Sequence, residues 1–362
     1  MLRRVSVNFL LQSAIAVVGV ALVAVLAVGA WSAWSEVATA SRLERIAEVE
    51  GQAFRVLHNL RLDRSFTVRV LEHDGTPDPV QMRQVTQSRA AELPALAAAL
   101  AGLRQIDMPN GDAAAGELDA AAQKFTTLAK ESDADFTKPK SERRAGLPKE
   151  FETAATDLLG VLDRISDALV GLAKYQDPFV DQMMAMRDAA WIVRENGGDA
   201  SVIVSTALMA KQRLTAAQWQ HEVNLIGRTE AGWAMVQKLR NGAALPTALN
   251  AAIDKTRNGF FGADFLARRD EMVAMLAAGQ MPSIAVNDWT SQTVPRLGTV
   301  TDLAEAALAA AKQHAGEQLS AARGTLITKL AMLLGATRRN SLASSWRLRS
   351  ETISLITSIL TP

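Results

Sequence analysis

The sequence contains no cysteine and few aromatic residues. With no cysteine among its 362 residues, the chain has no disulfide, no cysteine-type zinc site and no thiol nucleophile. Phe, Trp and Tyr make up 5% of the chain although hydrophobic residues make up 49%, so the apolar residues are mainly Ala, Leu and Val. Ala and Leu are strong helix formers, and a pattern typical of β-strands is nearly absent. These features predict an all-α fold.

The net charge and the lack of catalytic motifs exclude several functional classes. The formal net charge is +1, which gives no electrostatic indication of a nucleic-acid partner. The four histidines are scattered, and none has a second histidine at the spacing of a metal-binding helix. No glycine-rich phosphate loop, dinucleotide-binding motif or nucleophile elbow occurs in the sequence. We therefore expect no enzyme, no metal site and no cofactor.

The longest apolar stretch lies close to the N-terminus, at residues 9–31. A helix of this length covers roughly 34 Å, which is enough for the core of a bilayer. Arg3 and Arg4 precede it, so the positive-inside rule predicts a cytoplasmic start at residues 1–8. The alternative is a cleaved signal peptide ending near Ala38–Ala40, although the apolar run is longer than a usual signal-peptide core. We expect a single-pass protein of the inner (cytoplasmic) membrane, with most of the chain in the periplasm.

The rest of the chain, from residue 36 to residue 335, is predicted to form long helices separated by short turns. We predict eight helices, at residues 43–72, 80–103, 113–131, 149–175, 177–211, 215–240, 246–278 and 283–334. Long helices joined by short turns form antiparallel bundles, and eight are too many for one simple four-helix bundle. We therefore predict one or two stacked four-helix bundles, divided near residues 145–176, and an irregular tail at residues 336–362.

Arginines interrupt the apolar stripe of two of these helices. In the first helix, Arg61 and Arg64 lie one turn apart where apolar residues are expected. In the fifth helix, Arg187 and Arg194 flank Trp191 along a similar stripe. Guanidinium groups offer a planar set of donors that fits oxyanions. The pattern predicts a small anionic ligand bound between helices.

The sixth helix adds Arg228 to these candidates, although an ordinary exposed position is the stronger interpretation for it. Buried charge is costly unless it is paired, so arginines in a stripe require a negative partner. The alternative to a ligand is that the arginines pair with acids of the chain itself, and the candidate acids are Asp63, Glu50, Asp188 and Glu195.

The order of a basic start, an apolar helix and a long helical region resembles the sensor half of bacterial transmembrane chemoreceptors, the methyl-accepting chemotaxis proteins. The segment LRLDRS at residues 60–65 is similar to the Leu-x-x-Glu-Arg-Gly motif of nitrate- and nitrite-sensing helical domains. Asp63 stands in place of Glu, Ser65 in place of Gly, and Arg61 where Gln is common. The resemblance implies a sensor of two helical bundles in which Arg64 helps to bind an anion.

The resemblance covers residues 1–335, and residues 189–199 and 281–297 also look like sensor regions of such receptors. A receptor of this family continues with a second membrane helix, a HAMP linker and a cytoplasmic coiled coil. We expect the chain to end before these regions, because residues 326–336 are apolar but too short to span a bilayer.

The functional prediction is a membrane-anchored extracytoplasmic sensor of chemoreceptor type. It would bind a small ligand between helices and transmit a helix shift across the membrane. The resemblance further implies a homodimer. The alternative is a membrane-anchored helical scaffold that dimerises or binds a partner protein without a small ligand.

Overall fold

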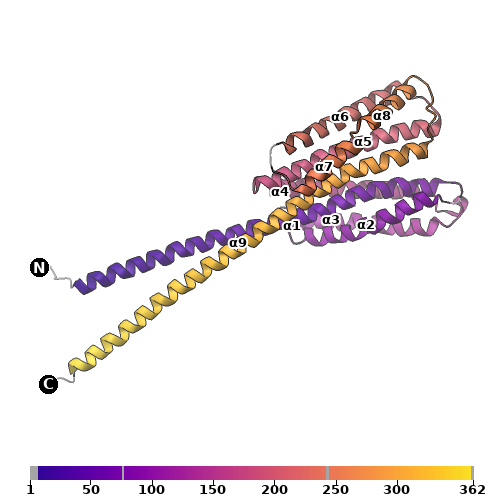
Figure 1. Ribbon diagram of the computed structural model, residues 1–362. Helices are drawn as coiled ribbons and strands as arrows, with labels where there is room; N and C mark the ends of the chain where they lie inside the picture. The colour runs from indigo at the N-terminus through magenta and orange to yellow at the C-terminus, as the bar shows by residue number, and fades with distance from the viewer. Residues whose placement is uncertain (1–6, 76, 242–243, 360–362) are drawn as a thin grey trace. The chain divides into compact units, whose positions relative to one another are not determined.

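The computed structural model describes residues 7–75, 77–241 and 244–359 (Figure 1). All regular secondary structure within these residues is helical, which confirms the all-α prediction. The helices are α1 (Val7–Glu72), α2 (Pro79–Leu103), α3 (Gly111–Asp135), α4 (Leu147–Ala173), α5 (Pro178–Ala210), α6 (Ala216–Arg240), α7 (Thr247–Gly259), α8 (Ala263–Ala277) and α9 (Val286–Ile359), with a 3-10 turn at Lys140–Glu142. Arg3 and Arg4 lie outside the described residues.

The chain divides into two compact units. The larger unit comprises Leu43–His314, and the smaller one combines Met1–Arg42 with Ala315–Pro362. In the larger unit, the distal part of α1 packs with α2, α3 and α4 to form the first bundle (Figure 1). Helices α5 to α8 and the first part of α9 form the second bundle. This arrangement agrees with the prediction of stacked bundles, and the chain passes from one to the other at the turn between α4 and α5.

Polar side chains in the turns cap the first residues of α2, α5 and α6, close to the predicted starts of these helices. Asp78 accepts a hydrogen bond from the Val80 backbone N at 2.8 Å, at the N-cap of α2. Asp177 does the same for α5, accepting from the Phe179 backbone N at 2.8 Å. Thr215 and Gln218 form a reciprocal capping box on α6. Each cap satisfies backbone donors that the helix itself leaves unpaired, so these short turns end one helix and orient the next.

The helix predicted at residues 246–278 is wrong as a single element, because it is broken into α7 and α8. Phe260 is buried, and Phe261 stacks on Trp233 with ring centroids 4.5 Å apart. At Gly262 a Cβ atom would lie 2.5 Å from the carbonyl oxygen of Asn258, so the chain can turn there only with glycine. The two aromatic rings anchor the break inside the second bundle.

The smaller unit contains the apolar part of α1. Within the described residues, α1 is the one helix that is long and apolar enough to cross a membrane. Its apolar side chains are exposed along most of this part, from Leu10 to Val28, and Trp31 and Trp34 are exposed beyond them. A lipid environment would cover such a surface, with the tryptophans at the interface. The predicted apolar helix at residues 9–31 is therefore present, and it is continuous with the helix predicted at residues 43–72.

The tail predicted to be irregular, at residues 336–362, is instead helical as far as Ile359. The physical reason is that no glycine or proline lies between Gly335 and Pro362, so the sequence contains nothing that ends α9 earlier. Apolar side chains of α9 at Ile327, Met332 and Leu334 are exposed.

Candidate functional site

Arg61 of α1 is paired with an acid of the other bundle. Its Nη2 donates to the Oε1 of Glu195 on α5 at 2.7 Å. The guanidinium also lies over the ring of Trp191, 4.8 Å from the centroid. That ring is held edge-on by Phe54, with the two centroids 5.2 Å apart. For Arg61, the expected pairing with an acid of the chain is correct, although its Nε is buried without a hydrogen-bond partner in the described structure.

Among the described residues, Arg64 makes one side-chain hydrogen bond, and most of its donors are not engaged by it. Its Nη1 donates to the hydroxyl of Thr156 on α4 at 3.0 Å, and that hydroxyl donates to the Glu152 backbone oxygen at 2.7 Å. Burial lowers the pKa of the Arg64 guanidinium, and the positive charge of Arg61 lowers it further. Both effects mean that Arg64 is incompletely neutralised by its surroundings.

Arg194 of α5 is the least satisfied of the predicted residues. Burial lowers its pKa to about 10, and the neighbouring charge of Arg61 contributes to this shift. Its Nε is buried, and among the described residues it has no hydrogen-bond partner. The guanidinium lies against the backbone one turn farther along α5, because a Cβ atom at Gly198 would be 2.6 Å from its Nη1. Glycine at this position gives the arginine its space.

These three arginines line one cleft within the larger unit, with a volume of about 400 Å³. Arg69 of α1 is the fourth arginine of the cleft, and burial lowers its pKa as well. Helices α1, α4, α5 and α9 form the walls, so both bundles contribute to it. The acidic residues of the cleft are Glu152, Glu195 and Asp199, and its apolar floor includes Phe66, Val202, Val294 and Leu297.

Arg187 does not line this cleft. It is buried and forms an ion pair with Glu50 of α1, and its Nη2 also donates to the Ser166 hydroxyl at 2.8 Å. A second acid, Asp188, lies 3.0 Å from its Nη1. The grouping of Arg187 with Arg194 is therefore wrong, because Arg187 is turned to Glu50 and Ser166 whereas Arg194 lines the cleft. The buried pair connects α5 of the second bundle with α1 and α4 of the first.

Trp191 and Arg228 have different positions from those expected for ligand contacts. Trp191 supports the guanidinium of Arg61 from outside the cleft. Arg228 is exposed on α6, a helix that contributes no residue to the cleft, so the interpretation as an ordinary surface charge is correct.

Sequence reasoning missed Arg69, Thr156 and Asp199. Arg69 follows Arg61 by eight residues, a spacing that returns to the same face of a helix, and this could have indicated it. Thr156 and Asp199 lie on helices with many polar residues, and nothing in their spacing distinguishes them. The contact of Thr156 with Arg64 and the place of Asp199 in the cleft both depend on how α4 and α5 are arranged against α1.

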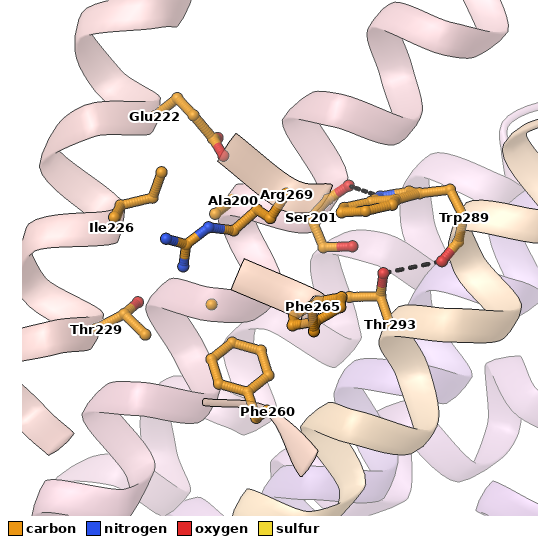
Figure 2. A pocket seen from close by; sticks show the side chains of 11 residues that line it. Ala200, Ser201, Glu222, Ile226, Thr229, Phe260, Phe265, Arg269, Trp289 and Thr293 are labelled. Atoms are coloured by element: carbon orange, nitrogen blue, oxygen red, sulfur yellow. Dashed lines mark hydrogen bonds between the residues drawn. The ribbon is translucent and has the colours of Figure 1, made fainter. Parts of the chain in front are cut away.

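The second bundle also contains a small enclosed cavity between α5, α6, α8 and α9, with a volume of about 10 Å³ (Figure 2). Glu222 is fully buried, and neither of its carboxylate oxygens has a hydrogen-bond partner within the described part of the chain. Burial raises the pKa of this carboxyl to about 8. In Figure 2 the guanidinium of Arg269 points into the space between Glu222, Ile226 and Thr229. The cavity holds at most one water molecule and is too small for a ligand.

No three His, Asp or Glu side chains in the described ranges come close enough together to hold a metal ion. His58 is half-buried, and the partial loss of solvent around its ring together with the charge of Arg194 lowers its pKa to about 3. This histidine is neutral at physiological pH, so it adds no positive charge to the four arginines.

Comparison of the chain with protein-family models, with curated proteins and with solved structures finds no match.

Proposed function

We propose that the protein is a membrane-anchored sensor of chemoreceptor type that binds a small anionic ligand in the cleft between its two bundles. The observation that supports this most directly is the pair of Arg64 and Arg194. These two guanidiniums come from different bundles, line one cleft of about 400 Å³, and have donors that no acid in the described part of the chain occupies. Positive groups in a partly desolvated cleft favour a bound anion.

The apolar part of α1 supports the membrane anchor. By the positive-inside rule, the larger unit lies outside the cytoplasm, which in a bacterium with two membranes is the periplasm. A sensor at this place meets small solutes directly. The resemblance of LRLDRS at residues 60–65 to nitrate- and nitrite-sensing domains agrees with an anionic ligand, and the resemblance to chemoreceptors suggests a homodimer.

The position of the cleft suggests how binding could produce a signal. Burial lowers the pKa of Arg194, and the positive charge of Arg61 adds to this shift, so without a ligand the two guanidiniums repel each other. An anion between Arg64 and Arg194 would relieve this repulsion and draw α1 and α5 together. Shifts of one to two ångströms between packed helices are typical of such transitions. Because α1 is one continuous helix, the element that carries Arg64 also carries the apolar segment.

The test is thermal unfolding of the full chain in detergent, with a panel of small inorganic anions, organic acids and amino acids. A ligand that binds only the folded state raises the melting temperature. We expect at least one negatively charged compound to do so, and we expect Arg64→Ala to abolish the shift while leaving the melting temperature without ligand nearly unchanged.

Arg228→Ala is the matched control, because it removes an arginine that is exposed on α6 and distant from the cleft. It should keep the full ligand response. If no compound changes the melting temperature of the wild-type protein, the sensor proposal is wrong, and the alternative of a helical scaffold that binds a partner protein gains support. An equal loss of response in both variants would also contradict the proposed site.

A further inference from the structure

The core of the first bundle contains two carboxyl groups that meet each other. Asp63 of α1 and Glu92 of α2 are both fully buried. The Glu92 carboxyl lies within hydrogen-bonding reach of Asp63, and no donor in the described structure is bonded to either of its oxygens. Two ionised carboxylates cannot hydrogen-bond to each other, because both are acceptors only. The contact therefore requires one proton between the two groups.

The donors around Asp63 indicate which of the two groups holds this proton. Arg89 of α2 donates through its Nε to both oxygens of Asp63, at 3.1 and 3.2 Å. The hydroxyl of Thr67 donates to the Oδ1 of Asp63 at 2.7 Å. Hydrogen bonds of this kind stabilise an ionised carboxylate. Because Glu92 has no such donors among the described residues, it is the group that keeps the proton and donates it to Asp63.

The charges around Glu92 agree with this assignment. Asp63 faces it from α1, and Arg89 lies one turn before it on α2. The guanidinium of Arg89 is also bonded to the exposed Asp133 of α3 at 2.6 Å, and from α4 it is covered by the uncharged ring of Phe151. Burial raises the pKa of Glu92 to about 9, the negative charge of Asp63 contributes to the increase, and the charge of Arg89 opposes it. Glu92 is therefore neutral below this pKa and ionised above it.

Two features next to Glu92 allow α2 to bend at this point. Pro94 lies inside α2 and has no backbone N–H, so it cannot donate to the carbonyl oxygen of Ala90 as the other residues of a helix do. A proline of this kind is a common cause of a bend in a helix. In addition, a groove of about 510 Å³ lies between α2 and α3, along Leu96 and Thr126. The helix is thus not closely packed against α3 on that side.

We propose that Asp63 and Glu92 form a proton-binding site that joins α1 to α2 and releases α2 when the proton is lost. With the proton in place, Glu92 donates to Asp63 and the two helices are connected in the core of the bundle. When the proton leaves for the solvent, two buried carboxylates remain beside one guanidinium, and they repel each other. The segment of α2 before Pro94 then moves away from α1. The first bundle thus responds to alkaline pH, whether or not the cleft between the bundles binds a ligand.

The experiment measures the position of α2 at pH 7 and at pH 10, which lie on either side of the pKa of Glu92. Because the chain has no cysteine, Arg55→Cys on α1 and Gln87→Cys on α2 provide one pair of spin labels at exposed positions. In the full chain in detergent, we expect the distance between these labels to increase by about 2 Å at pH 10, as is typical of shifts between packed helices. A second pair, Arg55→Cys with Ala98→Cys, places the α2 label beyond Pro94 and should show a smaller change.

Two variants test whether the proton of Glu92 causes the movement. In Glu92→Gln the amide donates to Asp63 at every pH, so the distance at pH 10 should equal the distance at pH 7. Glu92→Leu cannot ionise either, and it should also give a distance that does not depend on pH. Glu131→Gln removes an exposed acid of α3 in the same bundle, and it should keep the response of the wild-type protein.

The proposal is wrong if the distance in the wild-type protein is the same at both pH values. It is also wrong if the distance increases as much in the Glu92 variants as in the wild type. If one of the two variants does not fold, the other gives the answer. No ligand is present in this experiment, so a failure of the ligand site in the cleft would leave its result unchanged.

Discussion

Arg187 and Arg194 lie two turns apart on α5 and interrupt the same apolar stripe, but their surroundings are opposite. Arg187 is buried against Glu50, Ser166 and Asp188, so its charge is neutralised within the protein. Arg194 has a buried Nε without a partner in the described structure, and it faces the cleft. The first arginine connects the two bundles, whereas the second lines the cleft without such a partner among the described residues.

The comparison shows that an arginine in an apolar stripe has no fixed meaning. The role of such an arginine depends on whether a neighbouring helix places an acid within reach of the guanidinium. For Arg187, α1 supplies Glu50 at that level. Beside Arg194, the acid Glu195 is already paired with Arg61, and Arg194 forms no ion pair among the described residues.

The largest effect is expected from breaking the buried pair. Glu50→Ala leaves Arg187 buried beside Ser166 and without its main counter-ion, and removal of one member of a buried pair costs about 3–5 kcal/mol. Denaturant unfolding of the full chain in detergent should show this loss. Glu48→Ala is the matched control, because Glu48 lies two residues away and pairs with Lys312 near the surface, where such a pair contributes at most about 1 kcal/mol.

A double variant sharpens this test. Glu50→Leu combined with Arg187→Met removes both charges and keeps the volume, so most of the lost stability should return. If Glu50→Ala were no more harmful than Glu48→Ala, the role of the pair in connecting the bundles would be refuted.

The sequence allowed most of the fold to be predicted, for local reasons. The starts of α2, α5 and α6 agree with the predicted helix bounds, and the caps at Asp78, Asp177 and Thr215 explain them, because capping needs only residues close in the sequence. The break at Gly262 was missed because it depends on the burial of Phe260 and on the stacking of Phe261, which are tertiary contacts. The periodicity of the sequence contains no information about them.

The cleft could be predicted only in part. The positions of Arg61, Arg64 and Arg194 in apolar stripes indicated that they needed partners, and the structure brings these three together. The sequence could not show that Arg187 would find Glu50, or that Asp199 would face the arginines of α1. Both results depend on the packing of α5 against α1, and helical spacing describes only one helix at a time.

The second-largest effect is expected at Glu222, a buried acid whose carboxylate oxygens have no hydrogen-bond partner in the described structure. Burial raises the pKa of Glu222 in the folded protein to about 8 from an ordinary value of 4.5. The folded protein therefore keeps this proton to a higher pH than the unfolded chain. The stability that this group contributes is complete below about pH 4.5 and is lost as the pH rises through 8.

Glu222→Gln keeps a neutral group in the cavity of Figure 2 at every pH. The variant should match the wild type at pH 5 and be more stable than it by about 1–3 kcal/mol at pH 9, where the wild type buries an unpaired charge. The difference between the two unfolding free energies isolates this group from other acids. Glu230→Gln, on the same helix but exposed, should show no such dependence on pH, and an equal difference at both pH values would contradict the assignment.

The smallest effect on stability is expected from a substitution beside Arg194. This substitution tests ligand binding separately from the free energy of unfolding. At Gly198 a Cβ atom would lie 2.6 Å from the Nη1 of Arg194, so Gly198→Ala must displace that guanidinium. Alanine is also the better helix former, so the free energy of unfolding should stay constant or rise by up to about 1 kcal/mol. Affinity for the ligand should fall about tenfold, which corresponds to about 1.4 kcal/mol.

Gly171→Ala makes the same substitution in α4, where a Cβ atom meets nothing within 4 Å, and it should keep full affinity. A stable Gly198→Ala protein that binds its ligand as tightly as the Gly171→Ala protein would mean that Arg194 does not contact the ligand. Arg187 and Arg194 would then not differ in function, because both arginines would serve only the packing of α5. A loss of affinity without a loss of stability would show that the unpaired charge of Arg194 is used for binding.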